Sequence, residues 1–387
     1  MTTAPKHSPG PVTCLAICLT TLIGAPAAHA HWWKKLGDRS AATAYAVPLK
    51  NITIDGNLDD WPEDMVRYPV LNNWSPYGAS DLQGQSLQDN PDLTAHFMVG
   101  YDQQRQVLYV AAIVRDDVHV LVNNSEKHNS WETDAVEVYI DGMHAERHEP
   151  WYELPGIKGE SAMQYAGWVG PEGPDAPTAP WGEHCNPLGS NPFVRHVRAS
   201  DTGARFRGAR RGEHTVYEFA LRVHNRYPQV ARIEPGTRIG FDVVASDMDL
   251  HDGKMTDRGA WVPFGQRGAC KHWDASTLAD LVFLEDRSIL GSVAGQLTSE
   301  DADLKLDGII IEAWNGRLPA GKAHADAAGR FTLHLPAGTY TLRPLPGQDI
   351  ADSQTEIEVK AGKALKQVIE ANRPTEAGGG SDHGHHH

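Results

Sequence analysis

Short segments that alternate apolar and polar residues, separated by Gly and Pro, recur along this 387-residue chain from Tyr45 onward. The clearest is residues 217–223, in which Tyr217, Phe219, Leu221 and Val223 share one parity. A period of two predicts a β-strand with one face in an apolar core. Because no long segment with a helical period competes with these, the sequence predicts an all-β protein built as a sandwich or barrel. Further strands are expected at residues 52–54, 107–114, 135–140, 239–245 and 281–284.

The segment 129–142 joins an aromatic residue to an acidic strand. One parity holds Val136, Val138 and Ile140, which we expect to face a core, whereas the other holds Trp131, Ala135, Glu137 and Tyr139 and faces a groove or solvent. An indole stacks on the apolar face of a sugar ring, and a carboxylate accepts hydrogen bonds from its hydroxyls. The pattern therefore suits sugar binding, although an ordinary half-buried strand with a surface tryptophan has the same alternation.

Three motifs in order strengthen the sugar-binding interpretation. They are Asp55-Gly56-Asn57-Leu58-Asp59-Asp60-Trp61, the strand 107–114 with Arg115-Asp116-Asp117, and the segment 131–141. Their order and spacing resemble family 9 carbohydrate-binding modules, and the resemblance extends over residues 44–286. It implies a β-sandwich that binds carbohydrate without catalysing a reaction, and an association with glycoside hydrolases in carbohydrate catabolism.

The resemblance also implies site residues. Family members hold a terminal sugar unit between two tryptophans, whose places match Trp131 and Trp273. The family's glutamate on the acidic strand falls on Glu137. A family arginine that contacts the sugar would fall near Tyr165, where this chain has no arginine. Ligand identity is therefore open, and Tyr165 completes the predicted ligand-binding set.

A second pattern of strands begins after Arg287. The turn Asp326-Ala327-Ala328-Gly329-Arg330-Phe331 and the corner Pro336-Ala337-Gly338-Thr339-Tyr340 resemble those of carboxypeptidase regulatory-like domains. The resemblance implies a small prealbumin-type β-sandwich over residues 288–370 that serves as a spacer or docking module and carries no chemistry of its own.

Residues 1–30 have the features of a secretory signal peptide. Lys6 lies in a polar start, residues 14–24 form a short apolar run, and Ala28-His29-Ala30 supplies a small-x-small cleavage site. The mature chain would begin at His31 and be secreted or periplasmic. No apolar run reaches the about 18 residues of a membrane span.

Cys185 and Cys270 are the two cysteines that remain after residue 30. In an oxidising compartment they are expected to form a disulfide.

The mature chain carries 34 basic and 50 acidic residues, a formal charge of −16. Nucleic acids and anionic membranes demand basic surfaces, so neither is expected as a partner, and neutral ligands and cations remain. The final segment, 371–387, is rich in Gly and His and is expected to be disordered, with adventitious divalent-metal binding by its histidines. Residues 143–192 are expected to form a long ordered loop, rich in Pro and Trp, around a site.

The densest acidic loop offers a calcium site as an alternative to a solvated loop. Asp247, Asp249 and Asp252 supply carboxylates, which calcium prefers, but Asp252 stands where an EF-hand needs glycine.

No catalytic motif is recognised, so the chain is predicted to be a binding protein and not an enzyme, with no required cofactor. One alternative is a haem b electron carrier, because related sandwiches ligate haem through Met paired with His or Lys. Met163 or Met248 with His251 or His272 would supply such a pair. The other is a structural envelope or adhesion protein.

Overall fold

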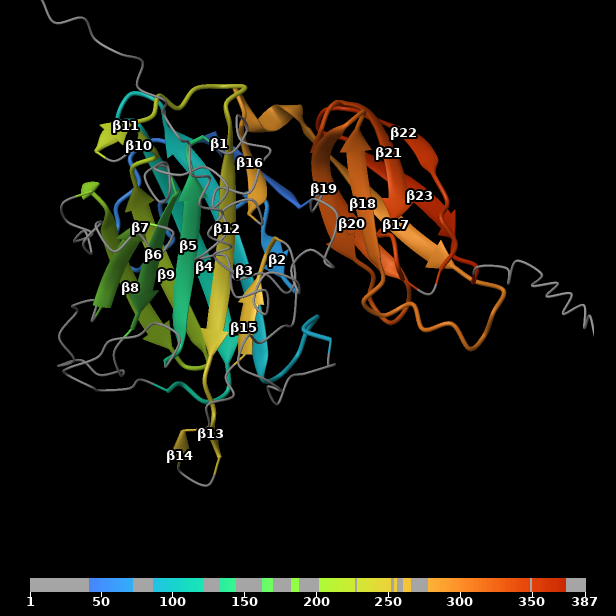
Figure 1. The fold of residues 1–387 in the computed structure, drawn as a ribbon, viewed down its shortest axis with the longest axis horizontal. Helices are drawn as coiled ribbons and strands as arrows, with labels where there is room; N and C mark the ends of the chain where they lie inside the picture. The colour runs from blue at the N-terminus through green and yellow to red at the C-terminus, as the bar shows by residue number, and fades with distance from the viewer. Residues whose placement is uncertain are drawn as a thin grey trace, which may run out of the picture. The chain divides into compact units, whose positions relative to one another are not determined.

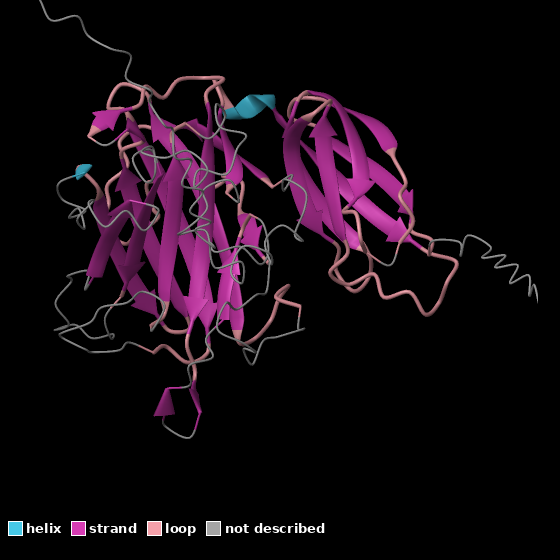
Figure 2. Ribbon diagram, in the orientation of Figure 1, coloured by secondary structure: helices cyan, strands magenta, loops and turns pink. Residues whose placement is uncertain are grey.

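The structure is a computed structural model. It describes residues 42–71, 86–120, 133–143, 162–169, 182–187, 202–226, 228–251, 254–255, 260–265, 278–348 and 350–373. Strands dominate this part of the chain, and a 3-10 turn spans Arg287–Ile289 (Figures 1 and 2). None of its helical segments has the length and apolarity to cross a bilayer. The all-β prediction is confirmed.

Sixteen of the described strands belong to the first part of the chain. They are β1 (Thr43–Pro48), β2 (Tyr68–Val70), β3 (Leu93–Asp102), β4 (Val107–Asp116), β5 (Ala135–Asp141), β6 (Ala162–Trp168), β7 (Gly182–Pro187), β8 (Arg205–Arg211), β9 (His214–Leu221), β10 (His224–Arg226), β11 (Gln229–Val230), β12 (Arg238–Asp247), β13 (Leu250–His251), β14 (Lys254–Met255), β15 (Ala260–Pro263) and β16 (Ala279–Phe283).

Twelve of these strands are linked in the order β7-β6-β5-β12-β16-β1-β3-β4-β9-β8, with β15 beside β12 and β2 beside β3. Strand β1 changes partners along its length, pairing with β16 through Thr43–Ala46 and with β3 through Val47 and Pro48. The chain of strands therefore folds into two sheets that share one core. Phe97 on β3 and Phe241 on β12 meet across it, with ring centroids 5.6 Å apart.

Most of the expected strands are present, and two expectations are wrong. Residues 52–54 do not form a strand, because Asn51 has a φ of 61° and the Thr53 amide donates to the Asp60 carboxylate at 2.6 Å. The segment 143–192 is not a single loop, since β6 and β7 lie within it and pair with each other. Met163 and Tyr165 alternate with Gln164 and Ala166, a short period-two pattern among loop-like neighbours.

Glu218 on β9 explains the Asp-Gly motif near the start of the chain. Its Oε2 accepts the amides of Asp55 and Gly56 at 3.0 and 2.8 Å, and its Oε1 accepts the Trp61 indole N–H at 2.8 Å. Gly56 has a φ of 83°, a conformation that favours glycine. The motif is therefore a turn that a buried carboxylate on a distant strand holds in place.

The later strands form a second, smaller sandwich. They are β17 (Leu290–Thr298), β18 (Ile310–Asn315), β19 (Leu318–His324), β20 (Arg330–Pro336), β21 (Gly338–Pro344), β22 (Thr355–Val359) and β23 (Ala364–Glu370), in sheets ordered β20-β17-β23 and β19-β18-β21-β22. In the predicted turn, Asp326 Oδ1 accepts the amides of Ala328 and Arg330 at 2.9 and 2.8 Å. In the predicted corner, the Tyr340 hydroxyl donates to the Pro336 carbonyl at 2.9 Å.

Candidate functional site

Strand β5 lies inside its sheet, between β12 and β6. Val136, Val138 and Ile140 belong to the apolar core, as their parity predicts. The opposite parity carries Glu137, which stands beside Val244 of β12 and Ala166 of β6. The two faces of one strand therefore serve different purposes, with packing on one and polar chemistry on the other.

Neighbouring strands add polar side chains to the face that carries Glu137. Tyr139 pairs with Asp242 on one side and Gln164 on the other, and Ser246 pairs with Ala135. Directly paired residues of antiparallel strands share a face, so the register alone gathers these groups. We call this set the polar face; its members are Glu137, Tyr139, Gln164, Asp242 and Ser246.

The polar face is buried and internally hydrogen-bonded. Glu137 is 1% exposed and Gln164, the most exposed member, is 6% exposed. The Tyr139 hydroxyl donates to Glu137 Oε2 at 2.5 Å, and the Gly265 amide donates to Asp242 Oδ1 at 3.0 Å. Two carboxylates, an amide, a phenol and a hydroxyl are the group types that recognise sugar hydroxyls.

Trp168 joins this face from β6. It packs against Ala135 and Ala166 in a small apolar cluster, and Ala166 stands directly beside Glu137. The sequence placed Trp168 only among the aromatics of a long loop. Trp168 alternates in phase with Gln164 and Ala166, and this parity predicts that it shares their face. The parity is informative only if residues 162–168 are recognised as a strand.

The predicted ligand-binding residues do not all come together. Tyr165 pairs with Val138 and lies in the apolar core, on the opposite side of the sheet from Glu137, because it is one residue out of phase with Ala166. It is therefore placed away from the polar face. Trp131 and Trp273 lie outside the described residues.

Other predicted residues are only partly placed. Cys185 lies in β7, and its backbone pairs with Tyr165 of β6. Cys270 and Asp252 lie outside the described residues. Met163, a predicted haem ligand, packs in the apolar core.

A second group of charged residues gathers at one end of the larger sandwich. Asp116 ends β4, Asp134 directly precedes β5, and His119 lies between them with its Nδ1 3.7 and 3.2 Å from their carboxylates. His119 Nε2 lies 2.9 Å from the Val169 carbonyl, so that nitrogen carries a proton. Burial lowers the pKa of His119, but the nearby carboxylates of Asp116 and Asp134 and the Val169 carbonyl outweigh it and raise the pKa to about 9. The two carboxylates therefore stabilise the protonated form of this partly buried imidazole.

Two of the predicted calcium ligands belong to an adjacent cluster. One carboxylate oxygen from each of Asp92, Asp247 and Asp249 lies within 4.8 Å of the others. Burial, followed by the charges of Asp249 and Asp117, raises the pKa of Asp92 to about 6. Burial, followed by the charges of Asp134 and Asp116, raises the pKa of Asp247. Asp92 was not predicted, because it is remote in sequence from the acidic loop.

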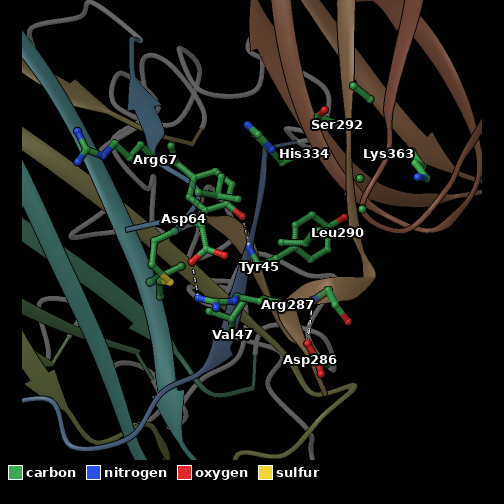
Figure 3. A pocket seen from close by; sticks show the side chains of 18 of the residues that line it. Tyr45, Val47, Asp64, Arg67, Asp286, Arg287, Leu290, Ser292, His334 and Lys363 are labelled. Atoms are coloured by element: carbon green, nitrogen blue, oxygen red, sulfur yellow. Dashed lines mark hydrogen bonds and ion pairs between the residues drawn. The ribbon is translucent and has the colours of Figure 1, made fainter. Parts of the chain in front are cut away.

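A cavity of about 1000 Å³ lies away from the polar face (Figure 3). Its wall includes Tyr45, Arg67, His334 and the ion pair between Asp64 and Arg287, whose N–O distance is 2.5 Å. None of its described lining residues belongs to the polar face, so the cavity and the polar face are separate features.

Comparisons with known proteins bear on the larger sandwich. Residues 64–153 match the family model described as "Carbohydrate family 9 binding domain-like". The structure is similar to that of a family 9 carbohydrate-binding module from Caldicellulosiruptor kristjanssonii in complex with cellotriose, at 13% identity and a TM-score of 0.38, covering 62% of this chain and 93% of that one. It is also similar to such a module from the same organism in complex with glucose, at 14% identity and a TM-score of 0.39, covering 62% and 95%.

No curated protein matches the chain. The family-model match confirms, over residues 64–153, the family 9-like domain that the sequence motifs indicated.

Proposed function

We propose that this chain is a non-catalytic carbohydrate-binding protein whose larger sandwich holds a terminal sugar unit between Trp131 and Trp273. The observation that carries the proposal is the family-model match over residues 64–153, which includes Trp131 and Glu137. The modules from C. kristjanssonii solved with cellotriose and with glucose suggest β-glucan fragments as the first ligands to test.

The polar face supports the same chemistry. Glu137 is held by the Tyr139 hydroxyl, and Asp242, Gln164 and Trp168 stand on the same face of the sheet. A fixed acceptor surrounded by amide, hydroxyl and indole groups is typical of sites that recognise neutral polyols. Since these side chains are nearly fully buried, direct contact with a sugar requires the face to open.

Calorimetric titration of the mature chain with gluco-, xylo- and manno-oligosaccharides tests the proposal. Each indole wall would cover about 80–100 Å² of sugar surface, about 2 kcal/mol at about 25 cal/mol per Å². Trp131→Ala and Trp273→Ala should therefore each weaken binding about 30-fold. Trp314→Ala, in the smaller sandwich, is the matched control and should leave affinity unchanged.

Glu137→Gln keeps the shape of the side chain but removes its charge, so it tests whether the carboxylate itself binds the sugar. If Glu137 accepts a sugar hydroxyl, the loss of the charged acceptor should cost about 1.5–3 kcal/mol of binding free energy. Wild-type affinity in both Trp131→Ala and Trp273→Ala would refute the site. Absence of binding to every sugar class would refute carbohydrate binding.

We also propose that the chain is exported and that its smaller sandwich folds alone and binds no sugar. N-terminal sequencing of periplasmic or secreted protein should give His31 as the first residue. A fragment spanning residues 288–370 should melt cooperatively and retain no glycan, because its seven strands complete both sheets among themselves. Saccharide binding by that fragment would contradict the proposal that the smaller sandwich binds no sugar.

A further inference from the structure

Strand β19 of the smaller sandwich is hydrogen-bonded to the larger sandwich. Its Ala320 carbonyl accepts from the Tyr45 hydroxyl of β1 at 2.7 Å, and its Pro319 carbonyl accepts from the Arg238 guanidinium of β12 at 3.2 Å. Tyr45 is only 4% exposed, so water competes little for its bond. Because both acceptors are backbone carbonyls, these bonds fix the strand itself against the larger sandwich.

A third bond from β19 ends one residue away from the polar face. Lys322 Nζ donates to the Gly265 carbonyl at 2.8 Å, and the Gly265 amide donates to Asp242 Oδ1 at 3.0 Å. Asp242, a member of the polar face, is fully buried. Gly265 is therefore held at its carbonyl by the smaller sandwich and at its amide by the polar face.

Gly265 is packed too closely against Asp242 to move independently of it. A Cβ at this position would lie 2.2 Å from Asp242 Oδ2 and 3.0 Å from the Ala279 nitrogen. The preceding residue, Phe264, is also fixed, since its amide donates to the Val243 carbonyl of β12 at 2.9 Å. Close-packed interiors transmit displacements, so a shift of the Gly265 backbone displaces the Asp242 carboxylate.

Lys322 is positioned by its own sheet before it reaches Gly265. It pairs directly with Glu312 of β18, which pairs with Arg343 of β21. The Glu312 side chain is 1% exposed and accepts from the Trp314 indole at 2.9 Å and from Arg343 at 3.2 Å. Opposite charges on directly paired residues attract each other, so a buried carboxylate of the smaller sandwich helps to place the lysine.

We propose that Lys322 is a positioning residue for the polar face, acting through Gly265 on the carboxylate of Asp242. The smaller sandwich then does more than separate or dock domains, because one of its side chains sets the geometry of a group in the larger sandwich. An effect on sugar affinity follows only if the polar face contributes to sugar binding, and this part rests on the proposed function.

Hydrogen exchange measured by mass spectrometry on the mature chain tests the inference at peptides that cover residues 260–265. Lys322→Met keeps the length of the side chain but removes the donor, so the Gly265 amide should exchange about tenfold faster. Lys322→Arg keeps a charged donor and should restore slow exchange. Lys366→Met, which removes an exposed lysine from β23 in the other sheet of the smaller sandwich, is the control and should exchange like the wild type.

Calorimetry with the gluco-, xylo- or manno-oligosaccharide that the wild type binds gives the second readout. Lys322→Met should weaken binding about three- to tenfold, with Lys322→Arg close to the wild type. Gly265→Ala should weaken it as well, because its methyl group displaces the Asp242 carboxylate without a change in the smaller sandwich.

Three results would overturn the inference. They are wild-type exchange at residues 260–265 in Lys322→Met, faster exchange throughout the chain in that variant, which indicates general destabilisation, and faster local exchange with unchanged sugar affinity. A wild-type chain that binds no sugar refutes the proposed function alone, because the exchange rates then decide whether Lys322 positions Asp242.

Discussion

Replacement of Glu218 by glutamine tests how the Asp-Gly motif is held. The carboxylate serves three donors with two oxygens, the amides of Asp55 and Gly56 on Oε2 and the Trp61 indole on Oε1. Glutamine has one acceptor oxygen. Whichever way its amide turns, an N–H group faces another N–H, and the arrangement that keeps both backbone bonds sacrifices the bond to Trp61.

The expected cost follows from the number of bonds lost. A hydrogen bond to a charged group contributes about 1.5–3 kcal/mol. Burial dominates the rise in the pKa of Glu218, so part of that gain is offset by desolvation of the charge. We therefore expect Glu218→Gln to reduce the local stability of residues 52–61 by about 2 kcal/mol, which corresponds to about 30-fold faster exchange of their amide hydrogens.

Hydrogen exchange measured by mass spectrometry on peptides that cover residues 52–61 gives the local readout. Glu213→Gln is the matched control, because Glu213 is exposed and its contact with Arg115 spans 3.6 Å. The double variant Glu218→Gln/Trp61→Phe removes the donor clash, so its effect should be smaller than the sum of the single effects by about 1 kcal/mol. Equal exchange in the Glu218 and Glu213 variants, or strict additivity, would refute this account.

Three further predictions concern other parts of the chain. Burial, followed by Arg67 and His214, lowers the pKa of His96 to about 4, so the folded state resists its protonation. The free energy of unfolding is then retained above the unfolded pKa of about 6.5 and falls as the pH is lowered from about 6.5 to 4. Chemical unfolding should show a loss of about 1–2 kcal/mol over this range in the wild type. His96→Gln should show none of this loss. A Cβ on Gly295 would lie 2.0 Å from the Phe331 ring, so Gly295→Ala should cost about 1–3 kcal/mol in thermal unfolding. Non-reducing peptide mapping should recover Cys185 linked to Cys270, and two free thiols in exported protein would contradict that pairing.

Of the features in the sequence, side-chain alternation along the strands was the one that best predicted the structure. Alternation placed Val136, Val138 and Ile140 in the core and Glu137 on the opposite face, because side-chain direction in a strand depends only on local geometry. The same rule failed for β6. Its alternation spans only seven residues among prolines and glycines, and a short pattern of that kind does not outweigh loop-like composition. Tyr165 was consequently grouped with Glu137 by family position, although its parity puts it in the core.

The clusters at the end of the sandwich show the limit of local reasoning. Asp247 and Asp249 belong to the acidic loop 247–252, but Asp92 reaches them only because β3 and β12 both border the shared core, with Phe97 against Phe241. Hydrophobic packing across the two sheets thus determines which carboxylates become neighbours. A sequence identifies the residue types that could bind a cation, whereas the register and sheet order decide which of them share one.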